Sequence, residues 1–420
     1  MVDLPLLNLS LVYIRRRNVG GVVGLSFWLR GNVGAMIISW FLFAISGSLT
    51  FPYLSKYLQM LGASDIEIGV VRALGSLAVP LTILPGGVLT DVIGRKRSIV
   101  IGTWGIAVVQ FLYAVVQDWR QFAVVYVVDW ALHFYQPALT AILLDSLPPE
   151  KRGGGMMLTA VLPQVPWLFL PPVGGYLLDH LGLLGVRLSF VISGLISVSV
   201  ALLRMRVLQE TITVNSVERR KLAREVLHSY FFWRGLFSVP PFVAYITLLG
   251  FLMSLASIAL QTFGVLYATN VVGLDNTSWG VVQSATTAVG IFFGLVLMPV
   301  IDKAPRVSAL FASLLLMAVG YFMVGTWANA VALVTAAILV GIGYEVSMSI
   351  RRALVGDYIT PENRGRVMGT TLALEYLGSI VGGIVVAYIY ATSPSLAFIF
   401  SGAVLLFAAV PLARSALQAR

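Results

Sequence analysis

Long apolar runs recur along the whole chain, and this repetition limits the possible folds more than any other feature. Each run has roughly 20 residues, the length that an α-helix needs to cross the hydrocarbon core of a bilayer. A buried soluble core explains one or two such runs, whereas we count about twelve. The sequence therefore predicts an all-α polytopic membrane protein with transmembrane helices near 32–55, 66–90, 98–117, 121–145, 153–178, 184–204, 242–268, 278–301, 306–326, 329–351, 365–391 and 394–412.

The placement of the basic residues predicts how these helices are oriented. Charged residues make up 11% of the chain and the net charge is +10, whereas soluble domains have about 25% charged residues. If the N-terminus is cytoplasmic and the helices alternate, 24 of the 28 Lys and Arg residues, including Arg204 and Arg351, lie on the cytoplasmic side. This bias places both termini in the cytoplasm of a cell whose plasma (cytoplasmic) membrane holds the protein. The positive charge then indicates topology and contact with anionic lipid instead of nucleic-acid binding.

The chain also repeats itself with an offset of 211 or 212 residues. Separate sites share this offset: Gly69 with Gly280, Asp91 with Asp302, Asp145 with Asp357, and Arg152 with Arg364. Each site falls at the same place in a helix pair, which is typical of an internal duplication. We therefore predict two pseudo-symmetric six-helix bundles at 32–204 and 241–413, a cytoplasmic linker at 205–240 and a cytoplasmic N-terminal segment at 1–31.

A charged loop after the second predicted helix carries a family resemblance. In GGVLTDVIGRKR, the pattern Gly, three residues, Asp, two residues, Gly-Arg-Lys is met by Gly87, Asp91, Gly94, Arg95 and Lys96. Together with two six-helix halves and PEKRG after the fourth helix, this loop resembles the major facilitator superfamily of secondary transporters. The resemblance implies that Asp91 bonds the other half when the cavity faces outward and releases it when the cavity faces inward. The alternative is that the loop only anchors the topology.

The second copy of this loop is weaker, because Met298 and Pro305 replace the two glycines while Asp302 and Arg306 remain. In each half we expect the arginine of PEKRG or PENRG to bond the preceding aspartate or to cap a neighbouring helix. The expected cytoplasmic gate comprises Gly87, Asp91, Gly94, Arg95, Lys96, Asp145, Arg152, Asp302, Arg306, Asp357 and Arg364.

Ionisable residues inside predicted transmembrane helices are costly and therefore mark functional sites. Asp129 and His133 are four residues apart in the fourth helix, so we expect them on one face as a close pair. The repeat offset places Glu345 at the position equivalent to His133, and Glu375 lies in the eleventh helix. Such transporters bind near the midplane between repeats, so we expect these four residues to couple protons or contact the solute. A structural His–Asp pair is the alternative.

Polar and aromatic residues of the same helices complete the expected cavity. Ser and Thr hydroxyls inside membranes more often bond their own backbone, and Arg72 has Glu67 as a possible partner. The acids and aromatics together suit a cationic or amphipathic solute. The cavity candidates are Ser46, Thr50, Tyr53, Arg72, Tyr126, Trp130, Gln261, Tyr344 and Tyr376.

The fifth helix contains a partial antiporter motif. Antiporters of the superfamily often carry Gly-Pro-x-x-Gly-Gly there, and this chain has Pro171, Gly174 and Gly175 with Leu170 in place of the first Gly. The eleventh helix has a similar pattern at 378–383. The partial match favours proton-linked efflux, with ordinary packing of small residues as the alternative.

We predict a secondary active transporter that moves a small organic solute by alternating access, coupled to protons, with efflux antiport favoured over uptake symport. An ion-independent facilitator (uniporter) and a non-transporting receptor or scaffold are the alternatives. An enzyme is not expected, because the 3 His are spread over different elements and no phosphate loop or nucleophile motif occurs. We expect no metal and no cofactor. The expected partners are the solute, protons and the lipid bilayer, with the chain acting as a monomer.

Overall fold

The computed structural model describes residues 28–213, 226–227, 240–301, 305–357 and 364–418. The longer described segments form helices, with no strand among the described residues. The helices before the predicted linker are α2 (Gly31–Thr50), η1 (Phe51–Tyr53), α3 (Leu54–Met60), α4 (Asp65–Ile93), α5 (Arg95–Val115), α6 (Trp119–Leu132), η2 (His133–Tyr135), α7 (Gln136–Ser146), η3 (Pro149–Lys151), α8 (Arg152–Val161), α9 (Gln164–Phe169), α10 (Pro171–Leu181) and α11 (Leu183–Val207). The helices after it are α13 (Pro241–Tyr267), η5 (Ala268–Val272), α14 (Asn276–Ile301), α15 (Arg306–Thr326), α16 (Ala330–Asp357), α17 (Arg364–Thr392) and α18 (Pro394–Gln418).

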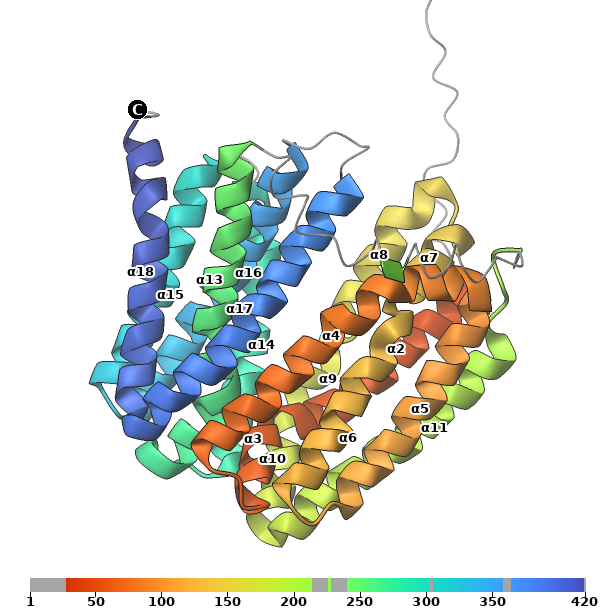
Figure 1. Cartoon of the computed structure of the whole chain (residues 1–420), viewed down its shortest axis with the longest axis horizontal. Helices are drawn as coiled ribbons and strands as arrows, with labels where there is room; N and C mark the ends of the chain where they lie inside the picture. The colour runs from red at the N-terminus through yellow and green to blue at the C-terminus, as the bar shows by residue number, and fades with distance from the viewer. Residues whose placement is uncertain (1–27, 214–225, 228–239, 302–304, 358–363, 419–420) are drawn as a thin grey trace, which may run out of the picture.

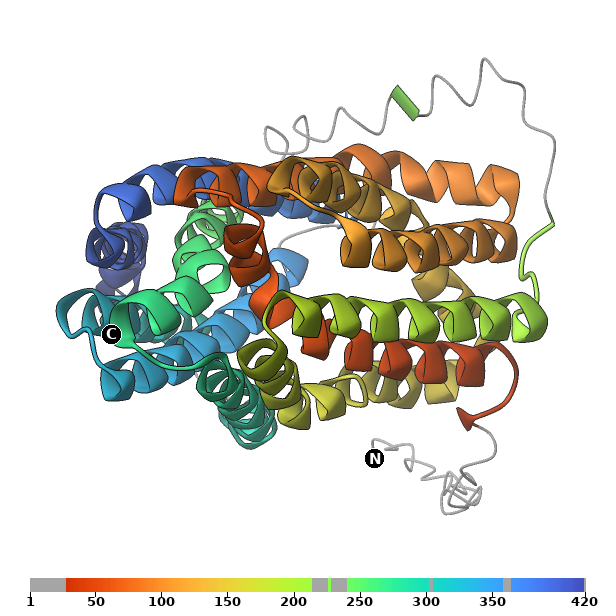
Figure 2. The same cartoon turned by 90° about the horizontal axis from the view of Figure 1, so that it is seen from below.

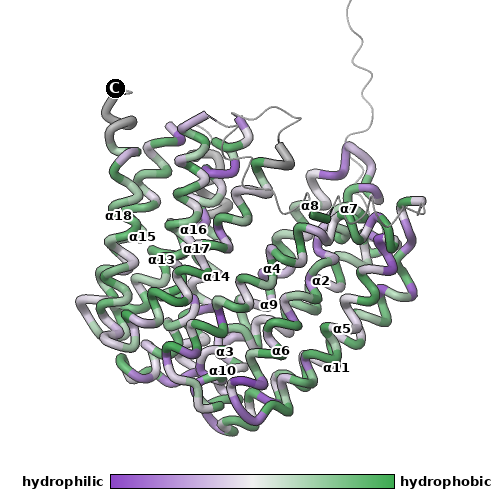
Figure 3. The backbone as a smooth tube through the Cα atoms, in the orientation of Figure 1, coloured by the Kyte–Doolittle hydropathy of each residue, from purple (hydrophilic) through white to green (hydrophobic). Residues whose placement is uncertain are grey.

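The predicted apolar spans correspond to these helices. Among the described residues, 11 helical segments are long and apolar enough to cross a membrane. The remaining predicted span, 278–301, is occupied by α14. Apolar residues follow the shafts of the helices, and hydrophilic residues gather at their ends (Figure 3). The prediction of an all-α polytopic membrane protein is therefore confirmed.

Three of the predicted helices are interrupted rather than continuous. The first bends into η1 at Pro52, the fourth into η2 before Pro137, and the fifth restarts at Pro171. Proline has no backbone N–H and clashes with the preceding turn, so the regular hydrogen-bond ladder ends at these points. The first two breaks lie at the cavities described below, since Phe51 and Pro52 at the first and His133, Tyr135 and Gln136 at the second line their walls.

The helices pack as two groups, α2 to α11 and α13 to α18 (Figure 1). We call the side where α2 begins and α18 ends the terminal face, and the side of α3 and α10 the opposite face. The ribbons of the two groups diverge toward the terminal face and meet near the opposite face. In the view from below, α4 runs beside α17 on one edge, and α10 lies beside α14 on the other (Figure 2).

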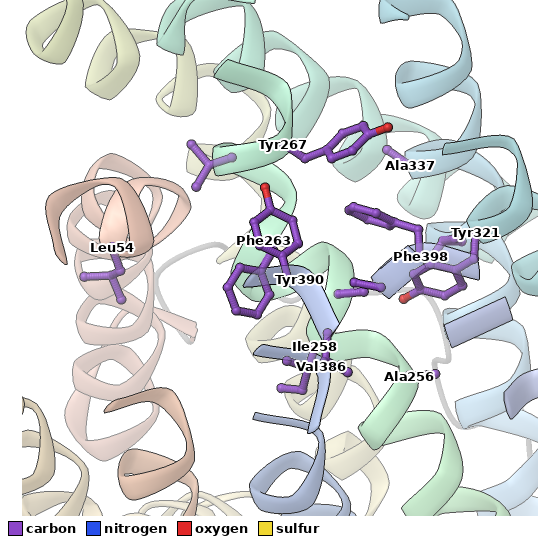
Figure 4. Packing of buried hydrophobic residues seen from close by; sticks show 14 of the residues in the cluster. Leu54, Ala256, Ile258, Phe263, Tyr267, Tyr321, Ala337, Val386, Tyr390 and Phe398 are labelled. Atoms are coloured by element: carbon purple, nitrogen blue, oxygen red, sulfur yellow. The ribbon is translucent and has the colours of Figure 1, made fainter. Parts of the chain in front are cut away.

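The buried core continues from one group into the other near the opposite face. Figure 4 shows its aromatic part in the second group, where Phe263 stacks on Tyr390 at 4.4 Å between ring centroids and Tyr267 contacts Phe398 edge-on. The Tyr267 hydroxyl donates to a backbone oxygen at 2.8 Å, which satisfies a polar group that would be costly to bury alone. Leu54 of α3 belongs to the same apolar cluster.

Candidate functional site

Two cavities lie inside the helical assembly. The larger, which we call the central cavity, has a volume of about 640 Å³ and is walled by α4, α9, α13, α14 and α16, which belong to both groups. The smaller, which we call the second cavity, has about 210 Å³ and lies inside the first group among α2, α5, α6, α7 and α11. Phe51 belongs to both walls, so the two cavities adjoin at this residue.

The central cavity collects predicted residues from both halves of the sequence. Its wall includes Arg72 of α4, Gln261 of α13, and Tyr344 and Glu345 of α16. Glu345 is exposed, so its carboxylate is accessible to a solute or to water. The wall also includes Trp167, one of the aromatics expected to suit a cationic solute. Sequence reasoning missed the aromatic Trp279 and the polar Gln164, Gln283, Thr286 and Thr287.

The second cavity holds most of the remaining candidates. Its wall contains Ser46, Thr50, Tyr126, Asp129, Trp130 and His133, together with the aromatic Trp40 and Phe43, which were not predicted. The Thr50 hydroxyl donates to the backbone oxygen of Ser46 at 3.1 Å, as expected for a hydroxyl in a membrane helix. The Thr50 hydroxyl is therefore not a free hydrogen-bond donor for a solute, and Thr50 mainly shapes the cavity wall.

Asp129 and His133 share this wall, but their side chains do not bond each other. His133 Nδ1 lies 2.8 Å from the backbone oxygen of Asp129. A carbonyl oxygen only accepts, so Nδ1 carries the hydrogen. The two residues therefore lie on one face, as expected, but the ring nitrogen of His133 bonds the backbone oxygen of Asp129 and not its carboxylate.

The Asp129 carboxylate is bonded elsewhere. Its Oδ2 accepts a hydrogen bond from the Tyr113 hydroxyl at 3.2 Å. Its Oδ1 is buried and has no hydrogen-bond partner among the described residues. A buried carboxylate oxygen without a partner is costly, so Asp129 is a strong candidate to bind a proton or a cationic group.

Arg72 lies at the boundary between the cavities. Its Nη1 donates to the Tyr126 hydroxyl at 2.9 Å, and its guanidinium lies 5.6 Å from the ring centre of Phe51. Glu67 is not its partner, because the Glu67 carboxylate accepts from the backbone N–H of Ser64 and caps the start of α4. Arg72 is thus held by aromatic groups that face the two cavities.

Glu375 lines neither cavity, contrary to expectation. It forms an ion pair with Arg351 at 2.7 Å, and the Arg351 side chain is 3% exposed. Arg351 is therefore buried inside the second group and is not part of a cytoplasmic loop, as its position in the sequence had suggested. Gly250 makes room for it, since a side chain at Gly250 would overlap the guanidinium. Removing one partner of such a buried pair is strongly destabilising. The ion pair therefore gives Glu375 a structural role inside the second group. Tyr376 also lines neither cavity.

The contact between α10 and α14, which we call the polar seam, joins the two groups at the opposite face. Both Asp179 carboxylate oxygens accept hydrogen bonds there: from the backbone N–H and side chain of Asn276 at 3.0 and 2.7 Å, and from those of Thr277 at 2.8 and 2.6 Å. Asp179 thereby caps a helix of the other group, where the N-terminal N–H groups lack internal partners. Predicted Tyr53 also lies here, donating to the Pro171 oxygen at 2.5 Å.

Sequence reasoning missed Asp179, although Gly174 and Gly175 were a signal. Side chains at these positions would overlap the backbone of Leu49 and of Asn276, respectively. The partial antiporter motif therefore lets α10 approach α2 and α14 closely enough for the Asp179 cap to form.

The contact between α4 and α17, which we call the glycine seam, joins the groups on the other edge. A side chain at Gly69 would overlap the backbone oxygen of Gly383 and the methyl group of Ala387. Gly383 in turn faces Ala73. Small residues let these two helices approach closely, as they do at many membrane helix contacts.

At the terminal face, the gate residues pair within each group. Arg95 bonds Asp145 at 2.5 Å and lies 3.5 Å from Asp91, and Arg306 bonds Asp357. The same pairing thus occurs at equivalent places in both halves. The arginine bonded to Asp145 is Arg95 rather than the expected Arg152.

Other gate residues have more local positions. Gly94 has φ +100°, a conformation that favours glycine and lets α5 begin directly after α4. The Lys96 backbone N–H donates to Glu210 at 3.0 Å. A side-chain carbon at Gly87 would contact no neighbouring atom. Asp302 and the side chain of Arg364 lie outside the described residues.

No group of three or more His, Asp or Glu side chains able to hold a metal ion occurs among the described residues. Two helical groups around a central cavity, closed at one face, are the architecture of a membrane transporter. The chain matches the Major Facilitator Superfamily over residues 36–306 and 266–419 and belongs to this family. It is therefore a membrane transporter and not an enzyme.

Two similar proteins span most of the chain. The MFS-type transporter MJ1560 of Methanocaldococcus jannaschii is 20% identical over 360 residues, which cover 85% of this chain and 90% of the relative. The quinolone resistance protein NorA of Staphylococcus aureus is 21% identical over 361 residues, which cover 83% of this chain and 87% of NorA.

Solved structures share the fold. A bacterial homolog of the human lysosomal transporter Spinster, in an inward-facing and unoccupied conformation, has a TM-score of 0.75 at 14% identity, covering 96% of this chain and 99% of that one. The human organic anion transporter MFSD10 has a TM-score of 0.66 at 18% identity, covering 90% and 98%. At these identities the likeness shows the fold alone.

Proposed function

We propose that this transporter is a proton-coupled secondary active carrier that moves a small organic solute by alternating access, as an efflux antiporter. The observation that carries the proposal is the Asp129 carboxylate, which is buried in a cavity wall with Oδ1 unpartnered among the described residues. A titratable group held in this way between the two faces is suited to bind and release a proton.

Alternating access is supported by the contrast between the two faces. The hydrogen bonds of Asp179, Tyr53, Lys56 and Trp279 cross between the groups at the opposite face. The Arg95–Asp145 pair and its equivalent stay within one group. The arrangement corresponds to a carrier open toward the terminal face, which we assign to the cytoplasm together with both termini and the linker at 205–240.

The gate proposal concerns the exposed carboxylate of Asp91. It is 62% exposed and only 3.5 Å from Arg95 of its own group, so it is available to bond the second group when the terminal face closes. A charge that contacts different partners in two packings can favour one of them. We assign this role to Asp91 and, by the repeat, to Asp302.

Coupling is proposed to act through the charge of the second cavity. Protonation of Asp129 removes a negative charge from this wall, and Glu345 offers a second titratable group in the central cavity. Such a change shifts the balance between two conformations by about 1–3 kcal/mol at typical coupled sites. The direction, efflux, is supported by the likeness to a quinolone resistance protein, and we assign the chain as a monomer of two six-helix bundles.

The test is solute flux in liposomes that contain the full chain, with a panel of amino acids, organic acids, sugars and cationic dyes. We expect an imposed pH gradient to drive flux, and Asp129→Asn to abolish gradient-driven accumulation while exchange at equal pH continues. Asp118→Asn is the matched control, because Asp118 caps the start of α6, the helix of Asp129, and lines neither cavity. In the same assay Asp91→Asn is expected to slow both modes of flux, since both need the gate.

Other outcomes assign the alternatives. Flux that ignores the pH gradient in the unaltered protein indicates an ion-independent facilitator. Absence of flux for every solute, with intact folded protein in the liposomes, favours a receptor or scaffold. If Asp129→Asn still accumulates the solute in response to the pH gradient, Asp129 does not couple the proton, and Glu345 becomes the candidate for that role.

A further inference from the structure

Arg204 is a fully buried cation that the transport mechanism above does not use. It lies near the end of α11 with 0% exposure and forms part of the wall of the second cavity. Its Nη1 donates to the Thr103 hydroxyl at 2.9 Å and to the Tyr135 hydroxyl at 3.4 Å. Its guanidinium carbon lies 5.2 Å from the ring centre of Phe43. These partners are all neutral, and no ion pair involves Arg204 among the described residues.

The unused donors of Arg204 lie on one edge of its guanidinium. Nε and Nη2 are buried without a hydrogen-bond partner among the described residues. In the planar guanidinium these two N–H groups point the same way, with a spacing that matches the two oxygens of a carboxylate. Burying two charged donors without acceptors is costly, and a bound carboxylate would satisfy both at once.

The same cavity holds the opposite charge. Asp129 lies in its wall with Oδ1 unpartnered, and it forms no ion pair with Arg204. A row of rings connects the two positions: Trp130 follows Asp129 and lies 5.5 Å from His133, whose ring stacks at 6.4 Å on Tyr135, a hydrogen-bond partner of Arg204. The fold therefore holds a buried acid and a buried guanidinium apart in one cavity, and each has an unmet polar group.

We propose that the second cavity binds a small zwitterion, with its carboxylate on Nε and Nη2 of Arg204 and its ammonium group on Oδ1 of Asp129. Both unmet groups are then paired, and the occupied cavity gains no net charge. The volume of about 210 Å³ is below the roughly 300–1,000 Å³ of pockets for drug-sized ligands, so the solute is of amino-acid size. This inference names a solute class for the proposed transporter and rests on that function.

The test compares three ligands on one carbon skeleton by calorimetry with the purified full chain in nanodiscs. Leucine carries both charges, 3-methylbutylamine lacks the carboxylate and 4-methylpentanoate lacks the ammonium. We expect leucine to bind at least about tenfold more tightly than either relative, because each loses one charged hydrogen-bonded contact. The same comparison is made with 4-aminobutanoate and 6-aminohexanoate and their single-charge relatives, so that the distance between the two charges of the ligand does not decide the result.

Variants then assign the binding energy to each end. Arg204→Lys keeps the charge but loses the paired donors. The affinity for leucine should therefore fall about tenfold, while the affinity for 3-methylbutylamine should not change. Asp129→Asn should lower the affinity for leucine but not the affinity for 4-methylpentanoate. Arg206→Lys is the matched control, because Arg206 is exposed two residues further along the same helix, and it should change nothing.

The comparison of ligands on the unaltered protein stands even where Arg204→Lys fails to fold. Binding of the amine as tightly as the amino acid, or no binding on any of the three skeletons, overturns the zwitterion site. If pH-driven flux of another solute persists in that case, the proposed function survives and only this inference fails. If neither binding nor pH-driven flux is found, both fail.

Discussion

The two groups of helices meet at the opposite face along two seams that are related by the repeat but differ in chemistry. The sequence offset makes Gly69 equivalent to Gly280. Gly69 meets Gly383 in the glycine seam, and Gly280 meets Pro171 and Tyr53 in the polar seam. Beyond these glycines the two seams differ in chemistry. The glycine seam also contains Ala73 and Ala387, whereas the polar seam contains the charged Asp179 cap on α14.

This difference indicates separate roles in opening the closed face. Water can replace the hydrogen bonds of Asp179, so the polar seam exchanges one set of bonds for another when it opens. The glycine seam has no such exchange, because its stability comes from the close fit of small residues. We therefore interpret the polar seam as an adjustable latch and the glycine seam as a contact fixed by shape.

The largest effect is expected from Gly69→Leu, which should prevent the glycine seam from closing. The new side chain overlaps backbone atoms of α17, and backbone cannot give way as a flexible side chain can. Because the chain has no cysteine, spin labels can be placed without background. Arg120→Cys lies at the exposed start of α6 in the first group, and Ala328→Cys lies between α15 and α16 in the second, so the pair reports the distance across the opposite face. We expect this distance to lengthen in most molecules, with loss of transport.

Gly87→Leu is the control on the same helix, since the first side-chain carbon there would contact no neighbouring atom. Its distance distribution should stay that of the closed face. An unchanged distribution in Gly69→Leu would show that α4 and α17 can separate without opening this face, and would remove the distinction between the seams.

The next effect is expected from Asp179→Ala, which removes the acceptor of four hydrogen bonds. A hydrogen bond to a charged group contributes about 1.5–3 kcal/mol when it is protected from water. Because Asp179 is exposed, we expect its loss to destabilise the closed face by about 1–2 kcal/mol in total. The open population measured with the same labels should rise about tenfold. Asp179→Asn keeps one acceptor oxygen and should have a smaller effect. A population unchanged by Asp179→Ala would contradict the latch.

The sequence could predict the helices and the equivalence of the two halves, because both are visible as patterns along the chain. The span of a bilayer fixes the length of apolar runs, and the duplication places Gly69 and Gly280 at one position in each half. Asp145 and Asp357 were likewise expected at equivalent places, and each bonds an arginine of its own group.

Partners across space could not be read from the chain. The ring nitrogen of His133 bonds the backbone oxygen of Asp129 and not its carboxylate, and Glu375 meets an arginine 24 residues away on another helix. Arg204 lies at a helix end and resembles a basic loop residue in sequence, yet it is fully buried. Burial and pairing are tertiary properties, and the periodicity of a nearly all-apolar helix does not say which face is covered.

The smallest effect is expected from Lys56→Met, which sharpens the comparison by testing whether every polar contact at this face acts as a latch. Lys56 Nζ donates to Thr269 at 3.1 Å and Asn270 at 2.9 Å in η5, and to Gln59 of its own helix at 2.9 Å. These acceptors are neutral and the side chain is half-buried, so its loss should cost less than about 1 kcal/mol. The open population should rise only about two- to threefold, several times less than in Asp179→Ala. An effect of Lys56→Met equal to that of Asp179→Ala would mean that the closed face is held by the number of crossing hydrogen bonds and not by the helix cap in particular.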